Sequence, residues 1–208
     1  MLWVLGRMKL KKWIDGLGTA ALKFDGRTQE LFKPHADGEA VAALHPISKL
    51  GDQPQLRTIA GGLIVAGIFA RSDRMVRAGS RMIIAHEAAT FVKDMLKTEV
   101  DRTRPRSAGS RYEKKPKKGK HTSKELTSFP SGHSAGAIAA ARAFSREFPE
   151  YGAAAVGAAA AIALLQIPRC AHYPTDVAAG VAIGLAAEAA SNAMWDFVGA
   201  DGESPAEA

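Results

Sequence analysis

Apolar residues along this chain fall into helix-length stretches, and strictly alternating apolar and polar positions are nearly absent. The β-branched and aromatic residues that strands favour are also sparse. The pattern therefore predicts an all-α protein. We expect helices over residues 8–24, 39–49, 56–70, 74–102, 131–147, 151–166 and 174–197, the last three punctuated by Pro149, Pro168 and Pro174.

The apolar runs have an ambiguous length. None reaches 18 uncharged apolar residues, but those over 58–70, 82–92, 151–167 and 177–195 come close, the last interrupted by Glu188. Such runs fit either the buried helices of a soluble bundle or short membrane helices extended by polar flanks, and their Ala/Gly richness favours close helix contacts in both settings. We expect short transmembrane helices, and hence a multi-pass protein of the inner or cell membrane.

A chain of 208 residues with 47% hydrophobic side chains can bury one substantial core, so nothing demands a second folded domain. We expect an amphipathic helical region over 1–56, a helical bundle over 57–198 with a long loop at 105–129, and a disordered tail over 199–208.

The first thirteen residues combine Trp3 and Trp13 with Lys9, Lys11 and Lys12, which are residue types found at the headgroup boundary of a membrane. A soluble surface helix has the same pattern, so both interpretations stay open. The charges follow the apolar stretch and no small-residue cleavage pattern is present, which argues against a signal peptide.

The net charge of +7 is concentrated in one loop, because residues 102–124 hold ten Lys or Arg and one Glu. Such a run suits anionic lipid headgroups, nucleic acid or plain solvation. Tyr112 is its only aromatic ring, so we do not expect nucleic-acid binding. The single cysteine, Cys170, excludes an intramolecular disulfide and any multi-cysteine metal site.

Three segments carry candidate chemistry. The first runs from Lys97 to Arg104-Pro105. If the helix continues to Arg104, seven residues at about 100° each bring the two cations onto one face, where both can reach a single anion. Taken alone, the segment is also typical of an ordinary basic helix end.

The second segment is Pro130-Ser131-Gly132-His133, followed by an apolar helical run. The free N–H groups of a helix start bind phosphate without any side chain, and a glycine lets a ligand approach the backbone. The motif therefore predicts an anion cradle with an imidazole beside it. A capped helix with an incidental histidine is the alternative.

The third segment contains His172 and Asp176, with Pro174 between them to open a helix. A carboxylate on one ring nitrogen fixes the tautomer of the imidazole and leaves the other nitrogen free to attack. Read alone, this pair is equally typical of a structural His–Asp hydrogen bond. Together, the three segments supply what phosphoryl transfer through a phosphohistidine needs.

Their order and spacing resemble the type 2 phosphatidic acid phosphatase superfamily, with its signatures Lys-x6-Arg-Pro, Pro-Ser-Gly-His and Ser-Arg-x5-His-x3-Asp. The first two signatures are complete here, but the third keeps only its His-x3-Asp half. Gln166 stands where the superfamily has arginine, and the nearest arginine is Arg169, three residues before His172. Either Arg169 or a donating Gln166 then replaces the missing cation.

The resemblance implies a helical bundle with its active site at the helix ends. It implies that His172 is the nucleophile, that Asp176 orients it, and that His133 protonates the leaving oxygen and later activates water. Phosphate would be bound by a set of cationic and backbone donors: Lys97, Arg104, Ser131, Gly132 and Arg169.

No metal or other cofactor is implied. His35, His45, His86 and His121 lack partners at metal-ligand spacing, and we expect His86 in the core. The short Ala-rich helices and the basic loop favour an anionic lipid phosphate as substrate, of the phosphatidate or isoprenyl diphosphate type. The alternatives are a soluble acid phosphatase, a vanadate-dependent haloperoxidase, or a non-catalytic binder of anionic membranes or nucleic acid.

Overall fold

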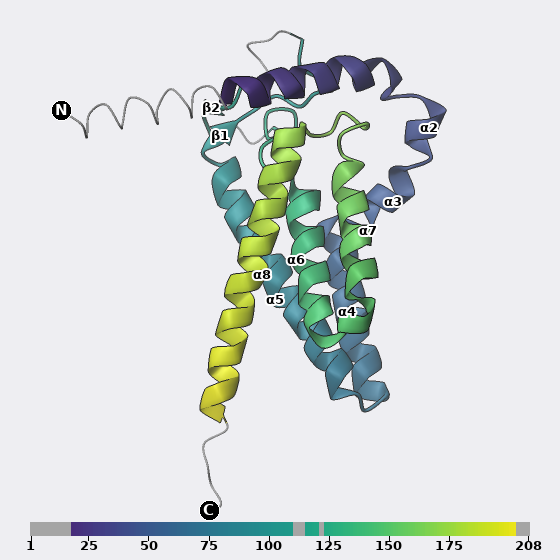
Figure 1. Ribbon diagram of the computed structural model, residues 1–208, viewed down its shortest axis with the longest axis vertical. Helices are drawn as coiled ribbons and strands as arrows, with labels where there is room; N and C mark the ends of the chain where they lie inside the picture. The colour runs from purple at the N-terminus through teal and green to yellow at the C-terminus, as the bar shows by residue number, and fades with distance from the viewer. Residues whose placement is uncertain (1–17, 110–114, 121–122, 203–208) are drawn as a thin grey trace, which may run out of the picture.

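The fold is known from a computed structural model that describes residues 18–109, 115–120 and 123–202. Within these ranges the chain is an all-α bundle, as predicted (Figure 1). Its elements after the first helix are η1 (Lys33–His35), α2 (Glu39–Ala42), α3 (His45–Lys49), α4 (Gln53–Phe69), α5 (Asp73–Lys97), β1 (Val100–Asp101), β2 (Lys117–Lys118), α6 (Gly132–Glu147), η2 (Pro149–Tyr151), α7 (Gly152–Leu164) and α8 (Pro174–Gly202).

Helix α6 is the centre of the bundle, packed against α5, α7 and α8, while α4 packs mainly on α5 and also contacts α6. The alanines of α6 are almost all buried. Helix α8 approaches it closely, since a Cβ on Gly180 would lie 2.4 Å from the Ser131 carbonyl oxygen and one on Gly184 would lie 2.6 Å from that of Ala135. The predicted close contacts of Ala/Gly-rich helices therefore hold the active-site end of α6 against α8.

The first described helix covers residues 18–32 and lies across the end of the bundle (Figure 1). We expected a helix over 8–24, and the observed helix continues eight residues further, until η1 begins at Lys33. It is fixed by its buried polar residues, because Gln29 Nε2 donates to the carbonyls of Pro105 and Ala108 at 2.6 and 3.1 Å. Trp3 and Trp13, on which the interfacial prediction depends, lie outside the described residues.

The predicted helix 39–49 is two short helices, α2 and α3. Pro46 lies in the first turn of α3. A proline has no N–H to continue the hydrogen-bonding of a preceding helix and disfavours helical geometry in the residue before it. The chain therefore turns at Ala43 and Leu44 and carries α3 toward the start of α4.

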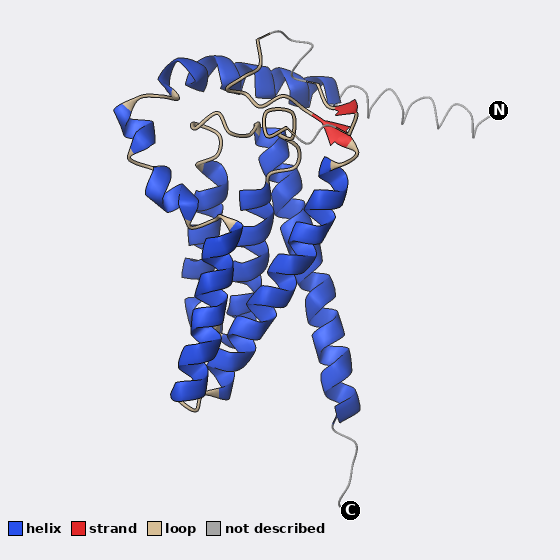
Figure 2. Ribbon diagram, turned by 180° about the vertical axis from the view of Figure 1, so that it is seen from behind, coloured by secondary structure: helices blue, strands red, loops and turns tan. Residues whose placement is uncertain are grey.

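The prediction that a helix runs from 74 to 102 is wrong at its end, because α5 stops at Lys97. Val100 and Asp101 instead form β1, which pairs antiparallel with β2 in the basic loop (Figure 2). Arg102 then forms an isolated bridge with Thr127. Lys97 and Arg104 consequently come from a helix end and a following loop, and do not share a helix face.

Helix α8 extends to Gly202, four residues into the predicted disordered tail, and its C-terminal half diverges from the other helices (Figures 1 and 2). In the described part of the chain one helix is long and apolar enough to cross a bilayer: Pro174–Val198, with a mean hydropathy of 1.4 and 28% of its apolar window buried. A shorter apolar helix spans Pro149–Leu164.

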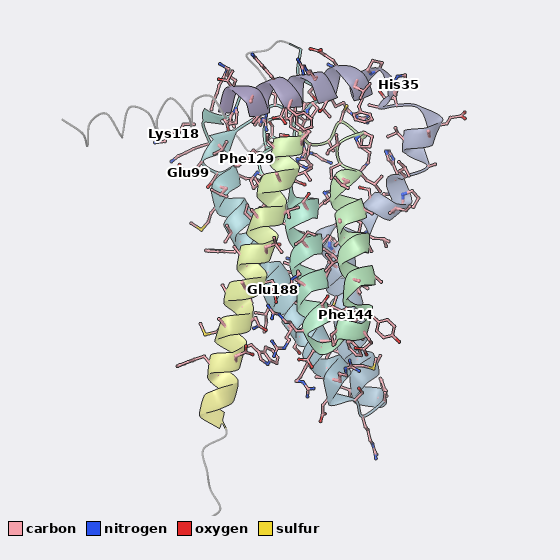
Figure 3. All side chains as sticks on the ribbon, in the orientation of Figure 1. His35, Glu99, Lys118, Phe129, Phe144 and Glu188 are labelled. Atoms are coloured by element: carbon pink, nitrogen blue, oxygen red, sulfur yellow. The ribbon has the colours of Figure 1, made fainter. Side chains whose placement is uncertain are left out.

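Glu188 interrupts the apolar sequence of α8 and is 2% exposed. It accepts from Arg146 Nε at 2.8 Å, so the one carboxylate in the middle of α8 is neutralised against α6. Glu188 and Phe144 lie toward the end of the bundle opposite Phe129, which directly precedes the Pro-Ser-Gly-His motif (Figure 3).

Candidate active site

A cleft of about 380 Å³ opens at the end of the bundle where α5 ends and α4 and α6 begin. It gathers predicted residues from all three motif segments, although these are separated by up to 75 positions in the chain. The predicted residues that line it are Lys97, Arg104, Gly132, His133 and His172.

His172 belongs to the loop between α7 and α8 and is 2% exposed. Its Nδ1 lies 2.7 Å from the carbonyl oxygen of Ser128, a partner that can only accept. Nδ1 therefore carries the proton, and Nε2, 3.3 Å from Arg104 Nη1 in the cleft, keeps its lone pair. Burial lowers the pKa of His172 to about 4, so the ring is neutral near pH 7. This is the protonation state that a nucleophilic imidazole requires.

Asp176 stands behind His172. The distance from His172 Nδ1 to Asp176 Oδ2 is 3.8 Å, beyond a direct hydrogen bond. The carboxylate accepts instead from the Ser128 hydroxyl at 2.6 Å and from the Tyr173 amide at 3.0 Å. Asp176 thus fixes Ser128, and the carbonyl of Ser128 accepts from His172. The carboxylate therefore orients the ring through Ser128.

Arg102 connects this arrangement to the helix over 18–32. Its guanidinium is 1% exposed, bonds to Asp176, donates to Asp25 Oδ2 at 2.6 Å and lies 4.1 Å from the centre of the Tyr173 ring. Asp25 also accepts from the Thr175 amide at 3.1 Å. One buried cation between two buried carboxylates fixes the His172 loop, and removing Arg102 would leave both carboxylates without their buried cation.

Lys97 and Arg104 meet in the cleft although no common helix carries them. Lys97 Nζ donates to the Thr127 carbonyl at 2.6 Å, and Arg104 donates to the carbonyls of Lys124 and Ala171 at 2.6 and 2.9 Å. Burial, with the charges of Arg104 and Lys93, lowers the pKa of Lys97 to about 8. The cations are held close together against their mutual repulsion, which an anion between them would relieve.

The Pro-Ser-Gly-His motif divides into a buried and an accessible part. Ser131 is fully buried as the N-cap of α6: its amide donates to the Asp176 carbonyl at 3.0 Å and its Oγ lies 2.8 Å from that of Ser134. The structure thus does not bring Ser131 to the cleft. Gly132, the first residue of the helix, does line it, at a position where amides have no partner within the helix.

His133, one residue further, is partly open to the cleft. Its Nε2 lies 2.7 Å from Asp52 Oδ1, at the start of α4. Burial lowers the pKa of His133, and the negative charge of Asp52 opposes that effect. The two histidines of the cleft therefore have opposite surroundings, a neutral carbonyl for His172 and a carboxylate for His133.

Comparison with known proteins agrees with the motif evidence. The family model of the PAP2 superfamily matches residues 79–198, more than half of the chain and all three motif segments. The chain belongs to the PAP2 superfamily. The crystal structure of LpxE from Aquifex aeolicus is similar in fold, with a TM-score of 0.57 and 22% sequence identity over 78% of this chain and 92% of that chain. A search of curated proteins gave no significant match.

The arginine that this PAP2 chain lacks is not replaced by Gln166 in the cleft. Gln166 is fully buried, and its Nε2 donates to the Ser48 hydroxyl and the Ile162 carbonyl, both at 2.9 Å. Arg169 also bonds to Ser48, and its charge acts on the pKa values of His133 and Arg104. Arg169 therefore lies beside the cleft, held by Gln166 and Ser48.

Sequence reasoning missed Lys93, a third cation that lines the cleft of this PAP2 protein. It is 7% exposed, with Nζ 2.7 Å from Asp94 Oδ1. Its spacing of four from Lys97 puts both lysines on one face of α5, which the sequence does contain as a signal. Asp52 and Ser128 have no such signal, because only the tertiary fold brings them to the two histidines.

His86 lies within α5, as the predicted core position requires, and is 2% exposed beside Gly136. Among the residues that the structure describes, no three His, Cys, Asp or Glu side chains are grouped so that they could hold a metal ion.

Proposed function

We propose that this PAP2 protein is a metal-independent phosphatase that hydrolyses a phosphate monoester or diphosphate of an anionic lipid through a phosphohistidine. One observation carries the proposal: the neutral, buried His172 presents an unprotonated Nε2 to a cleft whose other walls carry Lys97, Arg104 and His133. A nucleophile, a cluster of cations and a second imidazole are the parts of an in-line displacement at phosphorus.

In the first step, Nε2 of His172 attacks phosphorus and the bond to the leaving oxygen breaks. Nδ1 keeps its proton and continues to donate it to the Ser128 carbonyl. The phosphorylated ring therefore becomes cationic, with Asp176 nearby. His133 gives its proton to the leaving oxygen. Lys97 and Arg104 stabilise the charge on the equatorial oxygens, and the Gly132 amide adds a donor from the helix start.

In the second step, the now neutral His133 takes a proton from water, and the hydroxyl attacks phosphorus. The P–N bond breaks, inorganic phosphate leaves, and both histidines return to their starting states. Each function in this cycle is assigned to a protein side chain or amide, which supports a reaction that needs no metal ion.

The surface of the bundle supports a lipid substrate. Only 28% of the apolar window of α8 is buried, whereas the core helix of a soluble protein is mostly buried. Helices α4, α5 and α8 also carry exposed large apolar side chains, among them Phe69, Phe91 and Phe197. Such a surface is typical of a membrane or protein contact. We propose that α8 crosses the membrane, and that the cleft receives lipid phosphates at the bilayer surface.

The function is tested by measuring phosphate release from phosphatidate, an isoprenyl diphosphate and a soluble aryl phosphate, all with EDTA present. We expect turnover of at least one lipid in mixed micelles, unaffected by EDTA and inhibited by vanadate. His172→Ala should abolish it, whereas His35→Ala, at an exposed histidine of η1, should not. Turnover of the aryl phosphate alone would remove the lipid part of the proposal, and loss of activity in EDTA would remove metal independence.

The membrane part is tested separately by fractionating cells that express the full chain. We expect the protein in the membrane fraction, released by detergent but not by high salt or carbonate. A monodisperse product purified in plain buffer would contradict a spanning α8.

A further inference from the structure

Asp52 occupies the N-cap position of α4, where an aspartate ordinarily accepts hydrogen bonds from the first amides of its helix. Its side chain makes no such bond here. Pro54, in the first turn, has no N–H to offer. Helix capping therefore does not account for this carboxylate.

The carboxylate is directed instead at His133, with Oδ1 2.7 Å from Nε2. The preceding residue permits the approach, because a Cβ on Gly51 would lie 3.3 Å from His133 Cδ2 and 2.5 Å from Ile162 Cγ2. The turn between α3 and α4 thus passes close to the imidazole only because position 51 is glycine. Asp52 and His133 both line the cleft.

The surroundings of His133 otherwise oppose its protonated form. Burial lowers the pKa of His133 most, and the charges of Arg169 and Arg104 lower it further. Asp52 is the one acidic residue among the described residues that line the cleft. The other titratable side chains lining it are Lys93, Lys97, Arg104 and His172.

We propose that Asp52 is a positioning residue that orients the His133 ring in the cleft and favours its protonated form, so that His133 can act as the general acid. This inference rests on the proposed phosphatase function. In a cleft crowded with cations, an imidazole without a carboxylate would lose its proton to solvent before substrate arrived. Asp52 supplies the negative charge of the cleft lining that opposes this loss.

The proton balance of the step is unchanged. In the free enzyme the Nε2–H group of His133 donates to Asp52 Oδ1. When substrate enters, the leaving oxygen replaces the carboxylate as the hydrogen-bond acceptor of Nε2–H. The side chain of Asp52 is 39% exposed and has room to move aside. The proton passes to the leaving oxygen as the P–O bond breaks, and His133 regains one from the attacking water.

The test compares two soluble substrates that differ in their need for a general acid. An alkyl phosphate must have its leaving oxygen protonated, whereas 4-nitrophenolate leaves without a proton. We expect Asp52→Asn to lower kcat/KM, which reports the step that releases the leaving group, about 10- to 100-fold for the alkyl phosphate and less than about threefold for 4-nitrophenyl phosphate. Asp52→Glu should restore much of the alkyl phosphate activity, because it keeps the charge.

Asp37→Asn is the matched control, since Asp37 pairs with Arg106 on the surface, outside the cleft, and should leave both rates unchanged. Equal losses on both substrates in Asp52→Asn, or no loss on either, would overturn the role of Asp52 while leaving the phosphatase intact. A wild-type protein that releases no phosphate from either substrate or from lipid would remove the proposed function and this inference with it.

Discussion

The two histidines of the cleft are built in opposite ways. His172 is 2% exposed and rests on a backbone carbonyl in a loop fixed by Arg102 and Asp176. His133 lies in the first turn of α6, remains partly accessible, and faces the carboxylate of Asp52. Burial with a neutral acceptor keeps one imidazole uncharged, and a carboxylate favours the charged form of the other. The same side chain is thereby suited to attack at one position and to proton donation at the other.

This difference also shows which parts of the fold the site depends on. The His172 loop depends on a buried charge network that reaches to Asp25 in the helix over 18–32. The surroundings of His133 depend on the turn before α4, which can approach the imidazole ring because position 51 is glycine. The helix over 18–32 is thus part of the structure that supports His172, although it precedes the matched family region.

The largest effect should come from removing each histidine in turn. His172→Ala should lower kcat at least about 10³-fold on every substrate, because no attacking atom remains. His133→Ala should lower kcat/KM, which reports the leaving-group step, about 10²-fold or more for an alkyl phosphate and much less for 4-nitrophenyl phosphate. Steady-state kinetics of both variants on both substrates measures this. Identical patterns in the two variants would contradict the division of roles.

The second effect concerns pH. The active form of His172 is neutral, and its pKa of about 4 lies below that of a free histidine, so the nucleophile should stay active until the pH falls to about 4. Below that, kcat/KM for 4-nitrophenyl phosphate should fall about tenfold per pH unit. A separate inflection near pH 6 belongs to the phosphate ester itself. An NMR titration of the ¹⁵N-labelled His172 ring with a midpoint near 6.5 would contradict the burial argument.

Most of the helices and the residues of the cleft were predictable because they depend on local signals. Apolar runs and prolines located α4, α6, α7 and α8, and motif spacing selected Lys97, Arg104, His133 and His172. The end of α5 was not predictable, because its continuation as β1 depends on pairing with β2, sixteen residues away. The sequence alone shows Arg102 as one more cation of a basic loop. Its buried role was not predictable, because its partner Asp25 is 77 positions distant.

The smallest effect should separate Gln166 from Arg169, the two candidates for the missing superfamily arginine. Arg169→Ala should raise KM about threefold to tenfold, because its charge lies beside the cleft without lining it. Gln166→Ala should leave kcat unchanged but cost about 1–3 kcal/mol of stability, since it removes a buried amide bonded to Ser48 and Ile162. Kinetics and thermal unfolding of both variants measure these effects. If Arg169→Ala lost as much activity as His172→Ala, Arg169 would contact the transferred phosphoryl group, and Gln166 would only support it.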